Sequence, residues 1–336
     1  MIRTDAFTHL FPPAYFERIQ ELIPNKGPIK RWLTIPTLYD VEARLRMIDS
    51  FGDYQQILSN SQPPIEQICG PEDSPALARL ANDGFAELCR KYPDHFPTFV
   101  ASLPMNNTRA SIEEIDRCVE ELGAGGVQFF TNVDGAPLDH DDYFPIFERM
   151  AHHDLPIWLH PTRGAKFSDY AKEEKSKYEV WWTFGWPYET SAAMSHIVFS
   201  KIFEKLPDLK IITHHMGAMV PFFEGRVGPG WDQLGSRTSD EDYDGLLASL
   251  QKRPVDYFKM FYADTALFGS LSATKCGFDF FGADKIIFAS DCPFDPEGGY
   301  QFIRDTMNVL DQMDLTPQDR ENVMGGNIRR MMKVKV

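Results

Sequence analysis

The chain has 336 residues, and 43% of them are hydrophobic, which supplies a large apolar core and excludes an intrinsically disordered protein. The 34 Lys and Arg residues face 49 Asp and Glu residues, so the net charge is −15, and the basic residues are scattered. We therefore expect no nucleic-acid partner and no binding to an anionic membrane. There is no secretory signal pattern and no apolar run long enough to cross a bilayer, so we expect a soluble cytoplasmic protein.

Eight short apolar runs recur along the chain, and a longer segment with helical periodicity follows each run. This alternation predicts parallel βα units. The predicted strands are residues 2–10, 56–60, 96–103, 126–132, 156–160, 209–215, 260–264 and 285–291. The predicted helices are residues 40–51, 74–91, 109–122, 143–153, 190–205, 218–227, 243–251, 268–277 and 300–312.

Eight such units predict an α/β protein with a closed (β/α)₈ TIM barrel, formed by one domain over residues 1–336, because closure leaves no exposed sheet edge. An open doubly wound sheet is the structural alternative. Residues 22–37, after the first strand, and residues 163–187, after the fifth, exceed what a minimal barrel needs. We interpret both segments as insertions that serve as lids or partner surfaces.

Ionisable residues stand at the ends of the predicted strands. His9 ends the first strand, His160 the fifth, His214 and His215 the sixth, and Asp291 the eighth. Barrel active sites form where the strands end, so these side chains are expected around one cavity. Imidazole and carboxylate groups together suit a divalent metal ion. We predict a metal site with open positions, formed by His9, His160 and Asp291.

Several segments together resemble a known family: TDAFTHLFPP, RLRMID, a long stretch from VQFFTN to WLHPT, KIITHHMGAMVPFFEGR, IIFASDCPFD and GGNIRRM. In this order the chain resembles the amidohydrolase superfamily. Within it, the chain is most similar to the branch that contains aminocarboxymuconate semialdehyde decarboxylase, γ-resorcylate decarboxylase and 5-carboxyvanillate decarboxylase. The resemblance implies a metal-dependent hydrolase type of (β/α)₈ barrel and a homodimer or higher homo-oligomer. It also implies one divalent metal, with zinc expected first and manganese as the alternative, and no organic cofactor.

The resemblance also assigns roles to residues. The first-strand H-x-H motif falls on Phe7, Thr8 and His9, so a phenyl ring occupies the place of the first family ligand. Three protein ligands with solvent would still form a catalytic metal site. His215 takes the family role of catalytic acid or base, and Asp291 serves as ligand and proton carrier. Because side chains alternate along a strand, we expect His214 to point away from the cavity, between the barrel and its helices.

The implied reaction is the non-oxidative removal of CO₂ from an aromatic or muconate-like carboxylic acid. The metal would act as a Lewis acid, and Asp291, or water assisted by His215, would deliver a proton to carbon. Hydrolysis of a lactone or hydration of a double bond by the same site is the alternative. A metal-free ligand-binding scaffold, caused by Phe7, is a further alternative.

A planar acid substrate needs a cation and flat apolar walls. Arg163 and Arg44 are the candidate cations, although each is equally consistent with a solvated residue. Trp186, with the aromatic residues around it, is the candidate wall, and dimer packing is its alternative role. Asp264 ends the seventh strand, where it would orient a histidine ligand or cap the next helix.

Overall fold

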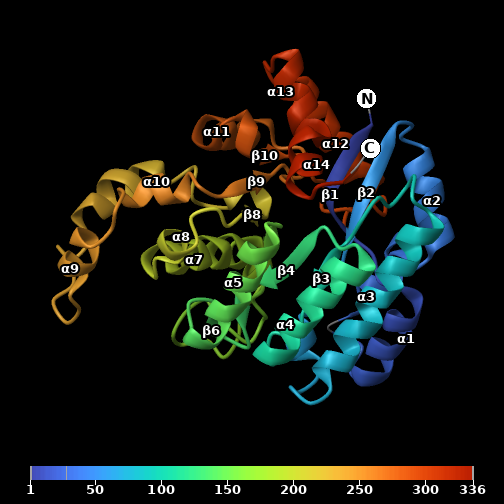
Figure 1. The fold of residues 1–336 in the computed structure, drawn as a ribbon, viewed down its shortest axis with the longest axis horizontal. Helices are drawn as coiled ribbons and strands as arrows, with labels where there is room; N and C mark the ends of the chain where they lie inside the picture. Colours follow the sequence, from blue (N-terminus) through green and yellow to red (C-terminus); the bar gives the residue numbers. More distant parts are fainter. Residues whose placement is uncertain (1, 28, 335–336) are drawn as a thin grey trace.

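Parallel strands form the centre of the protein in the computed structural model, which describes residues 2–27 and 29–334 (Figure 1). Among these residues, each of the eight predicted strands is present. They are β1 (Arg3–His9), β2 (Tyr54–Ser59), β3 (Val100–Ser102), β4 (Gly126–Phe130), β7 (Ile157–His160), β8 (Ile211–Thr213), β9 (Tyr262–Asp264) and β10 (Ile286–Ile287). A short antiparallel pair, β5 (Asn132–Val133) and β6 (Ala136–Pro137), follows β4.

The central strands pair in the order of the sequence. Strands β1 and β2 form one parallel pair, and β3, β4, β7, β8, β9 and β10 form a six-stranded parallel sheet. A parallel bridge between Leu58 and Phe99 connects β2 to the approach of β3. The backbone N–H of Ala6 on β1 donates to the carbonyl of Phe288, just after β10, at 2.9 Å. The fold is therefore α/β with parallel strands in sequential order.

Helices between the strands cover the outside of these strands, as the sequence predicts. They are α1 (Pro13–Leu22), α2 (Val41–Asp49), α3 (Ser74–Lys91), α4 (Thr108–Arg117), α5 (Phe144–His153), α6 (Val180–Thr183), α7 (Gly185–Phe199), α8 (Ile202–Lys205), α9 (Tyr243–Ala248), α10 (Pro254–Phe258), α11 (Leu271–Phe281), α12 (Tyr300–Asp311), α13 (Pro317–Glu321) and α14 (Asn327–Met331). Helix α2 begins where the Asp40 carboxylate accepts a hydrogen bond from the Ala43 N–H, a typical N-cap.

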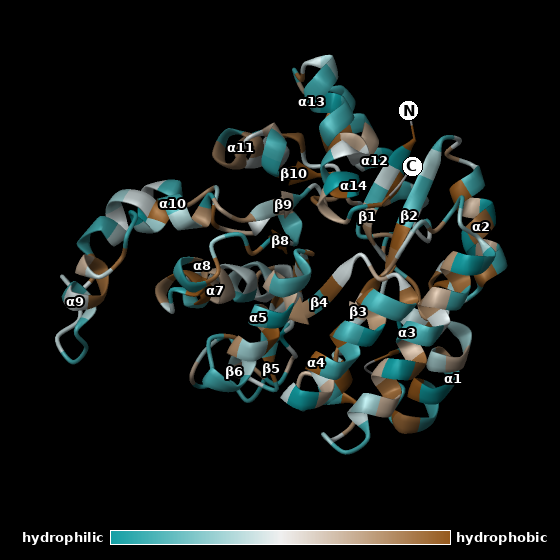
Figure 2. Cartoon of the chain, viewed as in Figure 1, coloured by the Kyte–Doolittle hydropathy of each residue, from teal (hydrophilic) through white to brown (hydrophobic). Residues whose placement is uncertain are grey.

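The strands are buried on both faces and separate two apolar cores. Side chains including Phe7, Ile57, Trp158 and Ile212 form the inner core between the strands. A larger outer core fills the layer between strands and helices. In Figure 2, β10 has the brown colour of hydrophobic residues, whereas β1 and β2 also carry hydrophilic residues. Strands buried on both faces have continuous apolar sequences, which explains why the short runs were recognisable.

One predicted helix is wrong, and another is divided. Residues 218–227 form mostly turns that lead into a π-helical turn, Arg226–Gly230. Gly217 and Ala218 have positive φ angles of 71° and 56°, which a right-handed helix does not allow. The predicted helix over residues 190–205 is divided into α7 and α8, and Lys201, with φ 62°, lies between them.

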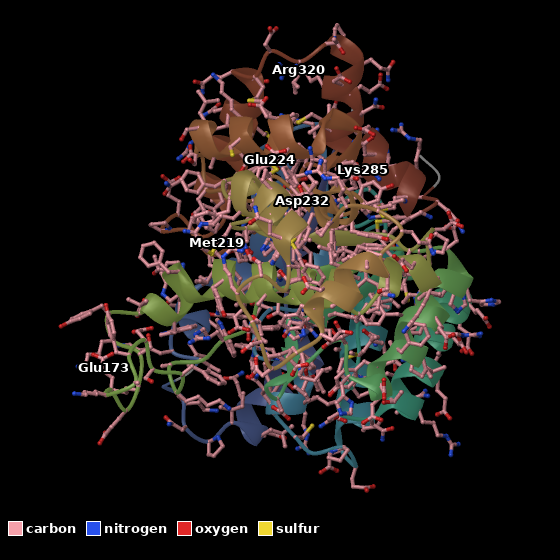
Figure 3. All side chains as sticks on the ribbon, turned by 90° about the vertical axis from the view of Figure 1, so that its left-hand side faces the viewer. Glu173, Met219, Glu224, Asp232, Lys285 and Arg320 are labelled. Carbon is pink, nitrogen blue, oxygen red and sulfur yellow. The ribbon has the colours of Figure 1, made fainter. Side chains whose placement is uncertain are left out.

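The two long segments differ in how they are anchored. In residues 22–37, Ile29, Trp32 and Ile35 are buried and form a separate apolar core with α1 and α3. Residues 161–179 contain turns and bends, and the loop that carries Glu173 projects from the body of the protein in Figure 3. Helices α10 and α9 lie at the left of Figure 1, and α9 is the farther of the two from the strands.

No helix within residues 2–27 and 29–334 combines the length and the apolar character that a membrane span requires.

Close packing between β4 and β7 leads to a stability prediction. A Cβ atom added at Gly126 would lie 2.4 Å from the Pro156 carbonyl oxygen and 2.8 Å from Trp158. We expect Gly126→Ala to lower the free energy of unfolding by roughly 1–3 kcal/mol, because backbone and indole have to move. Gly70→Ala, where the added Cβ meets nothing within 4 Å, is the control. Urea unfolding that gives equal losses for both variants would contradict this packing.

Candidate metal centre

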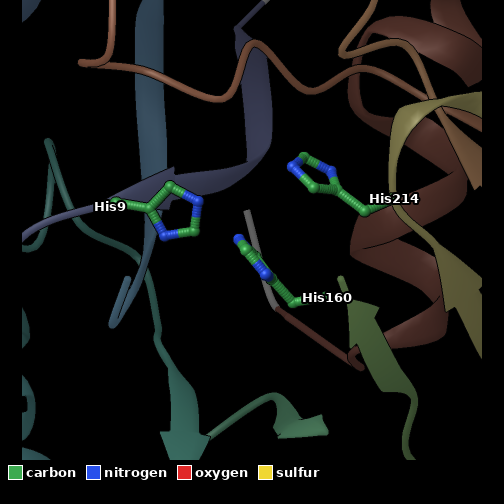
Figure 4. Close-up of side chains that lie close together, drawn as sticks. All are labelled: His9, His160 and His214. Atoms are coloured by element: carbon green, nitrogen blue, oxygen red, sulfur yellow. The ribbon is translucent and has the colours of Figure 1, made fainter. Parts of the chain in front are cut away.

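Four histidines and one aspartate meet at the ends of the central strands, where the sequence predicts His9, His160, His215 and Asp291 but not His214. His9 ends β1 and His160 ends β7, whereas His214 and His215 directly follow β8 and Asp291 lies beyond β10. One ring nitrogen from each of His9, His160 and His214 lies within 4.8 Å of the other two, and Figure 4 shows the three rings facing a common space. His214, His215 and Asp291 form a second group of the same kind, so one cluster contains all five side chains.

The prediction that His214 points away from this cavity is wrong. Strands β7 and β8 pair in parallel, and their last paired residues are Leu159 and Thr213. The next residues, His160 and His214, are therefore neighbours on the same face, and their ring centroids are 5.2 Å apart. Ile212 faces the inner core, so alternation places His214 on that side as well.

Protein acceptors hold the Nδ1 atom of each of the three converging imidazoles. Nδ1 of His9 lies 2.9 Å from the Asn60 carbonyl oxygen, and Nδ1 of His160 lies 2.7 Å from the Pro161 carbonyl oxygen. Nδ1 of His214 donates to a carboxylate oxygen of Asp264. Carbonyl and carboxylate oxygens only accept, so these partners place a hydrogen on Nδ1 and direct Nε2 toward the centre.

The Asp291 carboxylate lies among the Nε2 atoms. Its Oδ1 is 3.0 Å from Nε2 of His9 and 3.3 Å from Nε2 of His214, and its Oδ2 is 3.6 Å from Nε2 of His215. A carboxylate oxygen beside an imidazole lone pair is repelled, so the arrangement requires a proton or a cation between these atoms.

Burial and the charges of neighbouring groups shift the pKa values of the cluster residues in different directions. Burial and the neighbouring His214 and His9 rings hold the pKa of His160 well below its usual value. Burial also lowers the pKa of His214, but Asp264 and Asp291 outweigh it and raise that pKa to about 10. Although burial opposes ionisation of Asp291, His214 and the other imidazoles keep its pKa well below the usual range. These shifts put an ionised carboxylate beside one positive charge, which is either a proton on His214 or a bound cation that displaces it.

Phe7 forms the apolar floor of the cluster. Its ring is fully buried, and its centroid lies 4.8 Å from that of His214, 5.0 Å from that of His9 and 5.8 Å from that of His160. The phenyl ring stands where the first-strand motif predicts a ligand, but it offers no donor atom, and it packs against the three imidazoles.

Unusual backbone conformations surround the cluster. Asp291 has φ 64°, and His215 and Met216 have φ 55° and 56°. Left-handed conformations at residues other than glycine are uncommon and concentrate at functional sites. Asp291 and His215 both belong to the cluster despite these conformations, with Oδ2 and Nε2 3.6 Å apart.

The donor set fits one divalent cation. Three buried imidazoles and an ionised carboxylate meet the preferences of zinc and manganese ions. Nε2 of His214 is fully buried; it lies 3.3 Å from Asp291 Oδ1 and forms no hydrogen bond among the described residues. A buried nitrogen of this kind needs a partner, and a metal ion shared with the other donors would supply it.

Asp264 is fully buried and holds the end of β8 in place. Besides the His214 ring, its carboxylate accepts hydrogen bonds from the backbone N–H groups of His215, at 2.9 Å, and Ala266, at 3.1 Å. The structure thus supports the prediction that Asp264 orients a histidine of the site.

The structure places Trp186 at the cluster and pairs Arg163 with a carboxylate. The Trp186 ring centroid lies 5.9 Å from that of His160, and its indole N–H donates to the Arg163 carbonyl. The Arg163 guanidinium forms an ion pair with Glu189 at 2.7 Å. Its charge is therefore already partnered, which corrects the picture of a solvated loop arginine.

Arg44 is also not the solvated surface residue that one alternative predicted. It is fully buried on α2, where Nε donates to Gln56 Oε1 at 2.7 Å and Nη1 donates to the Thr37 carbonyl at 3.1 Å. Gln56 contacts Tyr54, whose hydroxyl donates to Asp5. Asp5 in turn accepts from the N–H of Ser290, so this chain of hydrogen bonds supports the loop that carries Asp291.

Sequence reasoning missed the buried polar residues Asn60, Gln128 and Glu66, of which Asn60 contacts the cluster through the His9 ring. Asn60 and Gln128 line a cavity of about 10 Å³, which has room for one water molecule. Their side-chain carbonyl oxygens have no hydrogen-bond partner among the described residues, and the same is true of Glu66 Oε1. Asn60 directly follows β2, so its position at a strand end is the one signal that pointed to it.

The chain belongs to the amidohydrolase family, whose sequence model matches residues 31–334. It is 28% identical over 289 residues to the 2-amino-3-carboxymuconate-6-semialdehyde decarboxylase of Dictyostelium discoideum, covering 86% of this chain and 75% of that protein. It is 29% identical to the γ-resorcylate decarboxylase of Polaromonas, covering 95% of this chain and 97% of that protein. These findings confirm the resemblance that the sequence motifs indicated.

A solved structure supports the fold. It is the 5-carboxyvanillate decarboxylase of Novosphingobium aromaticivorans, complexed with manganese and 4-hydroxy-3-methoxy-5-nitrobenzoic acid. It superposes with a TM-score of 0.80 at 23% identity, covering 99% of this chain and 96% of that one. The two proteins therefore share their overall architecture.

Glu66 generates a prediction about pH. Burial raises the pKa of Glu66 to about 8, so in the folded chain it keeps its proton at neutral pH, whereas the unfolded chain releases it. Stability should therefore fall as pH rises from about 4.5 to about 8, by at most about 1.4 kcal/mol per pH unit from this group. Glu66→Gln should flatten this decline, as measured by urea unfolding at several pH values. Glu72→Gln, at an exposed position in the same connection between β2 and α3, is the control and should keep the wild-type dependence of stability on pH. If Glu66→Gln also keeps the wild-type dependence, Glu66 is not the group responsible.

Proposed function

We propose that the chain is a metal-dependent, non-oxidative decarboxylase of an aromatic or muconate-like carboxylic acid. The observation that carries the proposal is the convergence of buried imidazoles around the Asp291 carboxylate. Relatives that cover nearly the whole chain at 28–29% identity are named as decarboxylases of such acids. The reaction class is therefore a carbon–carbon lyase.

We propose further that the strands close into a (β/α)₈ barrel as a single domain over residues 1–336. Residues 22–37 and 163–187 are its insertions. The parallel order of the eight strands supports closure. So do the hydrogen bonds that connect β2 to the approach of β3 and β1 to Phe288.

In this proposal His9, His160 and Asp291 hold one divalent metal ion, and no organic cofactor takes part. Manganese is the metal in a related solved structure. Imidazole and carboxylate donors such as those of this chain also accept zinc. When bound, such an ion acts as a Lewis acid toward substrate oxygen atoms.

Asp291 and His215 have complementary tasks in proton transfer. Loss of CO₂ leaves an electron pair on carbon, which must receive a proton. Burial and the neighbouring His214 lower the pKa of His215, so its ring is neutral and able to pass on a proton. Its Nε2 lies 3.6 Å from Asp291 Oδ2, which is longer than a hydrogen bond, so a small approach of the two groups would let them share a proton that Asp291 then delivers to carbon.

The surroundings suit a flat acid. Trp186 supplies an apolar wall beside His160, and Phe7 closes the floor. Arg163 and Arg44 are the proposed substrate cations. Arg163 would exchange its Glu189 partner for the substrate carboxylate. The buried Nη2 of Arg44, which has no hydrogen-bond partner among the described residues, would be a second donor. A cytoplasmic homodimer or higher oligomer completes the proposal.

The test is CO₂ release from a panel of hydroxybenzoates and muconate-like acids, with enzyme loaded with manganese or zinc. We expect the Asp291→Asn variant to lose roughly 100-fold or more in kcat, because both a ligand and a proton carrier are removed. Asp279→Asn, at an exposed position on α11, should keep wild-type activity.

The other outcomes identify the alternatives. Proton release from lactones without CO₂ would indicate a hydrolase, and water addition to an unsaturated acid would indicate a hydratase. A chain that binds these acids but takes up no metal would be a scaffold, and each of these results would overturn the proposed decarboxylase.

A further inference from the structure

We infer that His214 is a metal ligand of this chain and replaces the donor that is missing at Phe7. The inference rests on the proposed function, because it assigns one more residue to the metal of the same site. It divides the two adjacent histidines, with His214 as a ligand and His215 as the proton-transfer group.

The strand register supplies the first argument. The backbone N–H of His214 donates to the Leu159 carbonyl at 3.2 Å, which extends the pairing of β7 and β8 by one residue. His214 is thereby fixed beside His160, on the face that points to the inner core. A ring nitrogen of His214 lies within 4.8 Å of one from His9 and one from His160.

The hydrogen bonding of the His214 ring is typical of a histidine that binds a metal. Nδ1 of His214 is anchored by the fully buried Asp264 carboxylate, and its buried Nε2 lies 3.3 Å from Asp291 Oδ1 but forms no hydrogen bond within the part of the chain that the structure describes. Histidine ligands of metals show this arrangement: an acceptor fixes one nitrogen and increases the basicity of the other. His9 and His160 have the same arrangement with the Asn60 and Pro161 carbonyls.

The third argument is the contrast with His215. Its backbone N–H donates to Asp264, and its Nε2 lies within reach of Asp291, but no acceptor among the described residues anchors its Nδ1. Its side chain is 14% exposed, whereas that of His214 is 1% exposed. A partly exposed and less constrained imidazole suits proton exchange with solvent and substrate.

Phe7 leaves the metal site without a donor atom from the first position of the strand-one motif. With a phenyl ring beneath the site, His9, His160 and Asp291 leave the donor set one short of the family pattern. His214 packs against the same ring, 4.8 Å away between centroids, and restores a fourth protein donor. The competing reading makes His214 a buried imidazolium between Asp264 and Asp291, with the metal held by three protein ligands.

The experiment measures metal binding independently of catalysis. Metal-free wild type, His214→Gln and His215→Gln are titrated with Mn²⁺, followed by the electron paramagnetic resonance of the free ion, and with Co²⁺, followed by its visible spectrum. We expect His214→Gln to weaken Mn²⁺ binding roughly 100-fold and to change the Co²⁺ spectrum, whereas His215→Gln stays within about threefold of wild type. Unchanged affinity and an unchanged spectrum for His214→Gln would overturn the inference.

Two further measurements guard against a variant that does not fold. The double variant Phe7→His with His214→Gln should regain at least part of the lost affinity, because it returns a donor to the first strand. In wild type labelled with ¹⁵N-histidine, electron spin echo measurements on bound Mn²⁺ should count three coupled imidazoles. Two imidazoles would support the competing reading.

Failure of this inference is distinguishable from failure of the proposed function. Wild type that binds no metal and releases no CO₂ overturns the proposed function. Wild type that binds metal and releases CO₂, while His214→Gln binds metal equally well, overturns only the assignment of His214.

Discussion

The site depends on the anchoring of three imidazoles through their Nδ1 atoms. Two backbone carbonyls and the Asp264 carboxylate accept these hydrogen bonds, and each acceptor belongs to a strand or to the residues that follow one. Because the acceptors are part of the sheet framework, the rings have little freedom to turn. The result is a set of nitrogen donors directed at one point beside Asp291, prepared before any ligand arrives.

The register of the parallel strands places the histidine side chains next to one another. Equivalent positions on neighbouring parallel strands end at the same edge, so His160 and His214 become neighbours through register alone. The loop after β10 brings Asp291 to the same point, and the buried chain from Arg44 through Gln56, Tyr54 and Asp5 supports that loop at Ser290. The buried polar groups of this chain therefore stabilise the fold and also position Asp291 in the site.

The sequence was sufficient to predict the strands and the rim that carries His9, His160 and Asp291. Most strands contain a short apolar run, although β1 and β2 also carry polar residues. His9 and His160 end their strands, and Asp291 ends the last predicted run, beyond β10. The face of His214 was not predictable, because Ile211 and Ile212 are both fully buried and the alternation has no visible phase. Arg44 was equally ambiguous, since Arg46 on the same helix is exposed while Arg44 is buried. The turns at residues 217–218 depend on backbone angles that helical periodicity does not reveal.

The central claim is that the imidazoles and Asp291 surround a single divalent cation. Diffraction from crystals grown with Mn²⁺, recorded at a wavelength where manganese scatters anomalously, tests it most directly. The account predicts one strong anomalous peak within coordination distance of His9, His160 and Asp291, directly above the Phe7 ring. Manganese absent from this position in crystals that contain the ion elsewhere, or bound away from these side chains, would contradict it.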